Sequence, residues 1–173
     1  MIVGKPFLTV DQIQKKVKEL ADRISEDYEG KELLAVGILK GAFIFFSDIV
    51  RLIRVPLVVD FLIASSYIRS ETSGQVAIHY DIREDFTDKD VLLIDDIVDT
   101  GITLNYLRER ILMKGPGSLK ICTFLDKRER REVDIPLDYV GFEIPNDFVV
   151  GYGLDYDNKF RNLPYISVFK KTA

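Results

Sequence analysis

The sequence has little cysteine, no excess of basic residues and no long apolar run, and each absence narrows the class of protein. Its one cysteine, Cys122, cannot form an internal disulfide, which favours a cytoplasmic protein. Lysine and arginine number 24 against 28 aspartates and glutamates, so the net charge of −4 provides no general attraction for nucleic acid. The longest apolar stretch, residues 33–39, is too short to span a membrane, and no signal peptide is expected at the start of the chain.

The length and composition favour one compact enzyme. The 173 residues, 47% of them hydrophobic, suffice for one core and are too few for two ordinary domains. We therefore predict a single domain over residues 1–173. The only basic cluster, residues 127–131, is interrupted by Glu129, and a solvated loop accounts for most of it.

Helix and strand patterns alternate along the chain. Thr9 and Gln12 have the spacing of a capping box, and apolar residues follow at helical intervals up to Gly30. Further helices are predicted at residues 42–53 and 104–114, and strands at residues 33–39, 57–64, 76–80, 91–94, 120–125, 139–143, 149–150 and 166–169. The alternation predicts an α/β fold with a mostly parallel central sheet flanked by helices.

The segment at residues 65–74 interrupts this alternation. It contains serine, threonine, arginine, glutamate and glycine without periodicity. A mobile loop over a site and an ordinary hairpin loop both remain open.

Residues 91–103 carry the strongest functional signal. Four apolar residues predict a buried strand, which is followed by the adjacent acids Asp95 and Asp96, by Asp99, and by a turn that opens a helix. The carboxyl end of such a strand is where open α/β sheets bind ligands, and ribose hydroxyls or Mg²⁺ are suitable partners for adjacent carboxylates. Free backbone N–H groups at the helix start, with Gly101 allowing close approach, suit a phosphate. The pattern predicts a site for a phosphorylated sugar; a polar turn capped by Asp and Thr is the alternative.

The whole pattern resembles the signature of the type I phosphoribosyltransferases at every position: four apolar residues, two acids, two apolar residues, then Asp-Thr-Gly-x-Thr. Residues 141–163 resemble the hypoxanthine-guanine phosphoribosyltransferases more closely than other members of that superfamily, and the similarity covers roughly residues 33–168. The resemblance implies the type I phosphoribosyltransferase fold, with a small hood and a flexible loop over the active site.

The resemblance also implies a reaction of purine salvage. A nitrogen of hypoxanthine or guanine attacks C1 of 5-phosphoribosyl-1-pyrophosphate, and pyrophosphate leaves with Mg²⁺ as cofactor, giving IMP or GMP. The transition state resembles a ribosyl oxocarbenium ion, so the protein positions the reactants, neutralises the leaving group and handles a proton. A homodimer or homotetramer is also implied. The preference among hypoxanthine, guanine and xanthine stays open.

Roles follow for the positions that match the family. Contacts to ribose and its 5′-phosphate are implied for Asp95, Asp96, Asp99, Thr100, Gly101, Ile102 and Thr103, with Asp99 also the catalytic base toward purine N7. Pyrophosphate contacts are implied for Lys40, Gly41 and Arg161, with a non-proline cis peptide bond before Lys40. Purine contacts are implied for Lys127, Phe148, Val149 and Asp155. The resemblance also implies metal contacts for Asp95, Asp96 and Asp155, and closure of a loop that contains Ser66 and Tyr67. Read without the family, Phe148 is an ordinary core residue, Lys127 a solvated charge and Arg161 a surface ion pair.

Two positions depart from the family pattern, and one other class of function stays open. The first signature acid is Asp95, where many purine-salvage members carry glutamate, so that ribose contacts could run through water or metal. Residues 68–71 are bulkier and more charged than the matching loop of bacterial members. The alternative function is a regulator that senses phosphoribosyl pyrophosphate or nucleotides while binding nucleic acid, but we expect neither room for an added DNA-binding domain nor the net charge for a basic face.

Overall fold

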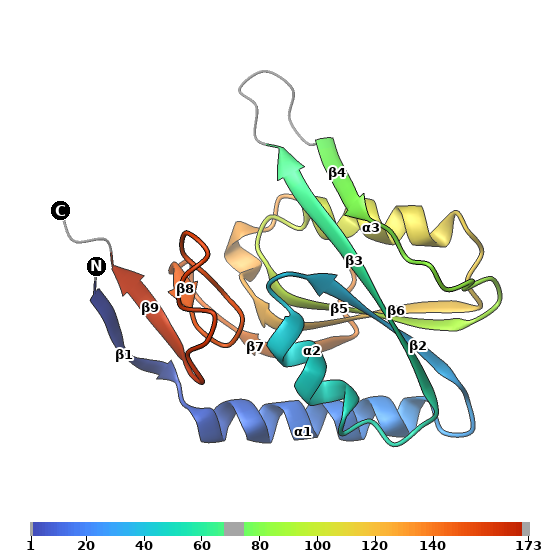
Figure 1. Ribbon diagram of the computed structural model, residues 1–173, viewed down its shortest axis with the longest axis horizontal. Helices are drawn as coiled ribbons and strands as arrows, with labels where there is room; N and C mark the ends of the chain where they lie inside the picture. Colours follow the sequence, from blue (N-terminus) through green and yellow to red (C-terminus); the bar gives the residue numbers. More distant parts are fainter. Residues whose placement is uncertain (1, 68–74, 171–173) are drawn as a thin grey trace.

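The computed structural model describes residues 2–67 and 75–170, which form a six-stranded and a three-stranded sheet (Figure 1). The larger sheet has the order β4-β3-β2-β5-β6-β7. Its strands are β2 (Leu33–Leu39), β3 (Leu57–Tyr67), β4 (Gln75–Tyr80), β5 (Asp90–Val98), β6 (Ser118–Asp126) and β7 (Tyr139–Glu143). All are parallel except β4, which pairs antiparallel with β3 at one edge. The predicted mostly parallel sheet is confirmed.

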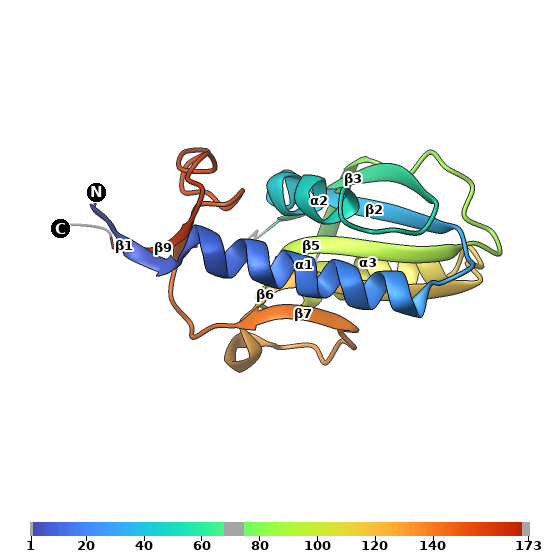
Figure 2. The same cartoon turned by 90° about the horizontal axis from the view of Figure 1, so that it is seen from below.

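Helices cover both faces of this sheet (Figures 1 and 2). Helices α1 (Val10–Asp27) and α2 (Phe43–Val50) lie on one face, and α3 (Ile102–Leu112) lies on the other. Because successive strand residues point to opposite faces, Leu33 packs in the core cluster under α1 and α2, whereas Leu34 packs in the cluster under α3. The run of apolar residues in each central strand is therefore explained by burial on both sides.

The first helix forms as its sequence predicts. The Thr9 hydroxyl accepts the Gln12 backbone N–H at 3.3 Å, and the Gln12 side chain accepts the Thr9 N–H at 2.9 Å, which completes the capping box. The side chains spaced at helical intervals, Ile13, Val17, Leu20 and Ile24, are all buried. Among the described residues, no helix combines the length and the apolar character needed to cross a bilayer.

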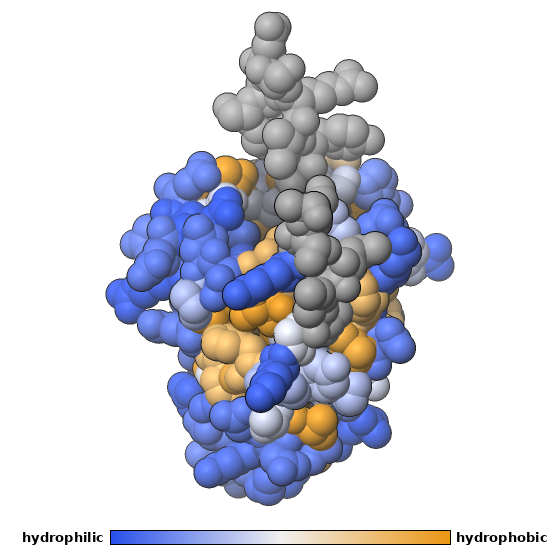
Figure 3. Space-filling model, turned by 90° about the vertical axis from the view of Figure 1, so that its left-hand side faces the viewer, coloured by the Kyte–Doolittle hydropathy of each residue, from blue (hydrophilic) through white to orange (hydrophobic). Residues whose placement is uncertain are grey.

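The small sheet forms the hood at the left of Figure 1. Its order is β1-β9-β8, from β1 (Ile2–Leu8), β8 (Val149–Val150) and β9 (Ile166–Lys170), all antiparallel. Strand β1 was not predicted, because its pairing partner β9 lies at the other end of the chain and its own residues include Gly4 and Pro6. Viewed from this side, hydrophilic side chains surround an apolar area (Figure 3).

Strand β5 is longer than predicted, which places the acids inside the strand and not after it. Pairing of β5 with β2 ends at Ile94, opposite Gly37, whereas pairing with β6 continues to Val98. The strand order reverses between β2 and β5, so this is the switch point at which open α/β sheets bind ligands. The carboxyl half of β5 therefore borders an opening beside β2.

Candidate active site

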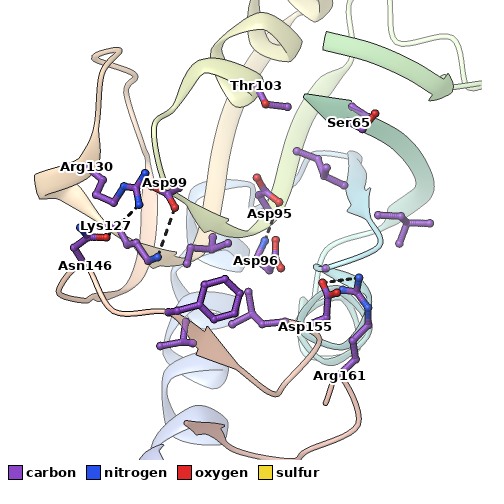
Figure 4. A pocket seen from close by; sticks show the side chains of 18 residues that line it. Ser65, Asp95, Asp96, Asp99, Thr103, Lys127, Arg130, Asn146, Asp155 and Arg161 are labelled. Carbon is purple, nitrogen blue, oxygen red and sulfur yellow. Dashed lines mark hydrogen bonds and ion pairs between the residues drawn. The ribbon is translucent and has the colours of Figure 1, made fainter. Parts of the chain in front are cut away.

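A pocket of about 840 Å³ lies at this switch point (Figure 4). It collects side chains from the ends of β2 and β3, from β5, from the start of α3, from the connection after β6 and from the hood segment. The lining residues are Ile38, Leu39, Gly41, Ala64, Ser65, Asp95, Asp96, Ile97, Asp99, Thr103, Lys127, Arg130, Asn146, Phe148, Val149, Leu154, Asp155 and Arg161.

The adjacent carboxylates of β5 form the floor of the pocket. Asp95 Oδ1 accepts the backbone N–H of Asp96 at 3.0 Å. Burial, together with the neighbouring charge of Asp96, raises the pKa of Asp95 well above its ordinary value, and burial also raises the pKa of Asp96. The pair is therefore a costly concentration of negative charge, which hydroxyl donors or a cation would relieve.

The connection after β2 packs directly against this pair. The Leu39–Lys40 peptide bond is cis, which confirms that prediction. A Cβ atom at Gly41 would collide with the Asp96 carboxylate, so any other residue at this position would force the carboxylate or the connection to shift. Lys40 is not among the residues that line the pocket.

The start of α3 supplies backbone donors. Gly101 precedes the helix with φ of 82°, a left-handed conformation that favours glycine, and as a residue without a side chain it makes no capping hydrogen bond itself. The Ile102 N–H lies 3.4 Å from the Thr100 hydroxyl, and Thr103 lines the pocket. An open helix N-terminus beside a pocket is suited to a phosphate.

Charged side chains gather on the opposite side, around Asp99. Lys127 is buried, and its Nζ lies 3.5 Å from Asp99 Oδ2. Arg130 Nε lies 2.8 Å from Asp99 Oδ1, and Arg130 Nη1 donates to Asn146 Oδ1 at 3.4 Å (Figure 4). The interpretation of residues 127–131 as mainly a solvated loop is therefore wrong for Lys127, which is buried, whereas residues 128–130 are exposed as expected. The missed feature is the short 3-10 helix η1 (Arg128–Arg130), which turns Arg130 toward the pocket.

The hood segment contributes an aromatic ring with an open face. The Phe148 side chain is 51% exposed although it contacts Tyr156 and Phe169 edge-on, with ring centroids 5.8 and 5.9 Å apart. The next residue, Val149, is buried and pairs with β9. A large exposed ring lining a pocket can stack on a planar ligand.

Asp155 and Arg161 form an ion pair at the other end of the hood segment. Arg161 Nη2 lies 2.7 Å from Asp155 Oδ1, and Asp155 Oδ2 accepts the Asn158 N–H at 2.8 Å. Arg161 also donates to the Gly153 carbonyl at 2.7 Å. Both residues line the pocket, with the guanidinium already paired.

Most of the predicted site residues meet in this pocket. Those that line it are Gly41, Asp95, Asp96, Asp99, Thr103, Lys127, Phe148, Val149, Asp155 and Arg161; Lys40, Thr100, Gly101 and Ile102 stand beside it in the chain without lining it. Ser66 and Tyr67 end β3, and their side chains, with residues 68–74 of the predicted loop, lie outside the described part of the structure.

Sequence reasoning missed several polar residues of the pocket, chiefly Ser65, Arg130 and Asn146. Ser65 stands one position before the matched Ser66, and Asn146 lies inside the segment that carries the C-terminal resemblance. Both could have been found from these neighbours. Arg130 gave no such signal, because its role depends on the fold of η1.

The chain is also similar to known proteins. The family model of the phosphoribosyl transferase domain matches residues 9–157. Hypoxanthine phosphoribosyltransferase of Salmonella typhimurium is 48% identical over 158 residues, covering 90% of this chain and 89% of that protein. Hypoxanthine-guanine phosphoribosyltransferase of Bacillus subtilis is 46% identical over 169 residues, covering 97% and 94% of the two chains.

The fold agrees as well. A crystal structure of a hypoxanthine-guanine phosphoribosyltransferase from Bacillus anthracis superposes with a TM-score of 0.94 at 44% identity, covering 98% of this chain and 100% of that one. Sequence and fold are therefore alike over almost the whole of both proteins. The chain belongs to the phosphoribosyltransferase family.

Proposed function

We propose that this protein is a hypoxanthine-guanine phosphoribosyltransferase of purine salvage. It transfers the 5-phosphoribosyl group from 5-phosphoribosyl-1-pyrophosphate to hypoxanthine or guanine, giving IMP or GMP and pyrophosphate. The observation that carries this proposal is the base side of the pocket: the Lys127 ammonium and the Asp99 carboxylate lie 3.5 Å apart beside the exposed Phe148 ring. One donor and one acceptor under a stacking ring match the O6 and N7 edge of a 6-oxopurine.

The ribose phosphate binds between β5 and α3. The backbone N–H groups at the start of α3 and the hydroxyls of Thr100 and Thr103 hold the 5′-phosphate, with Gly101 allowing close approach. Asp95 and Asp96 accept hydrogen bonds from the ribose hydroxyls, which relieves the unfavourable burial of both carboxylates. This arrangement fixes C1 of the sugar toward the base side.

The pyrophosphate leaves on the side of β2 and the hood. Lys40 and Gly41 face it through the connection after β2, and Arg161 binds its oxygens after separating from Asp155. The planar guanidinium can form two parallel hydrogen bonds to a phosphate group. Before pyrophosphate binds, the ion pair keeps Arg161 in the pocket and compensates the charge of Asp155. Ser66 and Tyr67, at the end of β3, close over the reaction.

Mg²⁺ is the proposed cofactor, and the residues fit it. Carboxylates are the oxygen ligands that this ion prefers, and it commonly binds through one or two of them together with substrate phosphates. Within residues 2–67 and 75–170, no three His, Cys, Asp or Glu side chains group into a metal cluster, which agrees with an ion held mainly by the substrate. Asp95 and Asp96 on one side and Asp155 on the other would hold it, and when bound it neutralises charge on the leaving pyrophosphate.

The base side carries out the proton transfer. Phe148 stacks on the purine, the main chain at Val149 contacts the edge of the ring, and Lys127 donates to O6. As the purine N9 forms its bond to C1, the bond from C1 to the pyrophosphate oxygen breaks, and Asp99 accepts or shares the N7 proton. Lys127 must leave Asp99 for O6 during this step.

Some further properties belong to the same proposal. The chain acts as one phosphoribosyltransferase domain over residues 1–173, it assembles as a homodimer or homotetramer, and it works in the cytoplasm, which its single cysteine favours. The alternative of a nucleic-acid-binding regulator has no support, because relatives that match over almost their full length are named as transferases.

A direct assay tests the function. The purified protein is mixed with phosphoribosyl pyrophosphate, Mg²⁺ and, in turn, hypoxanthine, guanine, xanthine and adenine, and nucleotide formation is followed by ultraviolet absorbance. We expect turnover of hypoxanthine or guanine and none of adenine. No turnover of any 6-oxopurine, together with retention of RNA or duplex DNA in a filter-binding test, would favour the regulator.

A further inference from the structure

Asp99 faces two cations, and one of them has no place in the mechanism described so far. Lys127 lies near Oδ2, whereas Arg130 Nε lies 2.8 Å from Oδ1 (Figure 4). Oδ1 is shielded from solvent and has no hydrogen-bond partner within the described residues, since the Arg130 N–H does not point at it. A buried acceptor left unsatisfied is costly, so a small rotation of the guanidinium that completes a charged hydrogen bond is favourable.

Arg130 is itself held in place from two directions. Its backbone N–H donates to the Lys127 carbonyl at 2.9 Å, which closes the turn of η1. Its Nη1 donates to Asn146, in the connection between β7 and the hood strand β8. The guanidinium of this fixed turn therefore links two other segments of the pocket, at Asp99 and at Asn146.

We propose that Arg130 is a positioning residue for Asp99, an inference that rests on the proposed function. When Lys127 turns to the purine O6, Asp99 loses the partner on Oδ2. Arg130 then keeps the carboxylate in place on its Oδ1 side, so that Oδ2 is free to meet the N7 proton. Arg130 acts through Asp99 and does not touch the purine.

A surface ion pair with no catalytic part is the competing explanation. The Arg130 side chain is 43% exposed, and pairs at such sites usually contribute little to stability. The two explanations differ in one measurable respect. A positioning residue should matter only while Asp99 is a carboxylate, whereas a structural residue should matter equally in any background.

The experiment is a double-mutant cycle in the purified enzyme, with Arg130→Ala made in the natural chain and in Asp99→Asn. In the natural chain we expect kcat with hypoxanthine to fall about 10-fold, the lower end for loss of a charged hydrogen bond, and KM for phosphoribosyl pyrophosphate to stay within about twofold. In the Asp99→Asn background the same change should alter kcat by less than about twofold.

Two further variants separate positioning from damage to the fold. Arg130→Lys keeps the charge without the planar fork and should recover part of kcat, and guanidinium ion at low concentration should rescue Arg130→Ala where sodium chloride does not. Arg128→Ala is the matched control, because Arg128 lies on the same turn and pairs with the exposed Glu143 at 3.6 Å, away from Asp99. It should leave kcat unchanged.

Each result decides between the two explanations. Equal losses in both backgrounds, or full activity of Arg130→Ala, would overturn the proposal while leaving the proposed function intact. If the natural chain itself turns over no 6-oxopurine, the failure lies with the proposed function.

Discussion

The two sides of the pocket differ in which groups form them: mainly backbone on one side and side chains on the other. The sugar-phosphate side consists of a buried central strand, a glycine pressed against a carboxylate and the open start of a helix, so its shape depends on the backbone. The purine side consists of side chains from loops and the hood, held by ion pairs among Asp99, Lys127 and Arg130. The groups of the first side are fixed by the backbone. The side chains of the second side are held by ion pairs, which must change partners when a substrate binds.

This difference suggests a division of labour. A phosphate needs only fixed donors, so a preformed backbone cradle binds it without reorganisation. A purine must be recognised by its edge and must also exchange a proton, which requires side chains that can change partners. Substitutions on the two sides should therefore separate, with losses in phosphoribosyl pyrophosphate use on one side and in purine use or turnover on the other.

The largest effect is expected on the purine side, at Asp99. Asp99→Asn keeps the shape but removes the base, so turnover should fall roughly 10²–10⁴-fold, the usual range for a general acid–base group. Binding of phosphoribosyl pyrophosphate should change little, because its phosphate meets mainly the backbone. Single-turnover kinetics and equilibrium binding measure the two quantities. Unchanged turnover when chemistry limits the rate would remove Asp99 from the mechanism.

The sugar-phosphate side is tested by Gly41→Ala. The added methyl group collides with the Asp96 carboxylate, so either the connection after β2 or the acid pair must shift. A misplacement of about 1 Å can cost about 10²-fold, and we expect a loss of this order in kcat/KM for phosphoribosyl pyrophosphate. Inhibition by a purine analogue that lacks the sugar should be unaffected. Gly4→Ala is the matched control, since Gly4, like Gly41, has no positive φ, and a Cβ there would meet no atom closer than 3.4 Å.

We expect Lys127 to decide the choice of base. Its ammonium can donate to the O6 of hypoxanthine or guanine but meets another donor in the amino group of adenine. A hydrogen bond to a charged group contributes about 1.5–3 kcal/mol, so Lys127→Ala should lower kcat/KM for hypoxanthine about 10- to 150-fold. Use of phosphoribosyl pyrophosphate should be nearly unaffected. Full activity with adenine still excluded would show that base selection lies elsewhere.

The same division explains what could be predicted from the sequence. Residues 91–103 are contiguous, and a strand, acids and a helix start follow from their local pattern, so the elements of the proposed sugar-phosphate side could be predicted from the sequence, with α3 beginning two residues earlier than expected. The end of β5 was misplaced because its last residues pair only with β6, a long-range contact without a local signal. The six-stranded sheet was predictable in kind because its buried strands alternate with helices.

The purine side was predictable only through family resemblance. Lys127 and Phe148 read as an ordinary charge and an ordinary core residue, and the structure shows the first buried beside Asp99 and the second half exposed. Arg130 was missed because it faces the pocket only through the turn of η1. Strand β1 was missed because it forms only when β9, from the opposite end of the chain, pairs with it.

The smallest predicted effect concerns stability. It measures how much the buried acid pair of the sugar-phosphate side lowers the free energy of unfolding. Because burial and the neighbouring Asp96 charge raise the pKa of Asp95, the native state binds more protons than the unfolded state between the ordinary pKa and the raised one. Stability therefore falls as pH rises through that interval. Above the raised pKa, the ionised Asp95 carboxylate destabilises the protein by about 1.4 kcal/mol for each pH unit that separates the folded-state pKa from the unfolded-state pKa.

Asp95→Asn removes this charge while keeping an oxygen for the Asp96 N–H, now 3.0 Å from Oδ1. A gain of about 1 kcal/mol would raise Tm by about 2–4 °C, even though ribose binding and turnover suffer. Thermal unfolding at several pH values measures the gain, which should shrink as pH falls through the raised folded-state pKa and vanish near pH 4, where the unfolded chain also takes up its proton. Asp27→Asn is the opposite control: the Lys120 ammonium, 2.8 Å away, lowers the pKa of Asp27, so removing that charge should give no gain. A lower Tm for Asp95→Asn at neutral pH would mean that the buried acids are already compensated, and that the sugar-phosphate side binds its substrate at no cost to the fold.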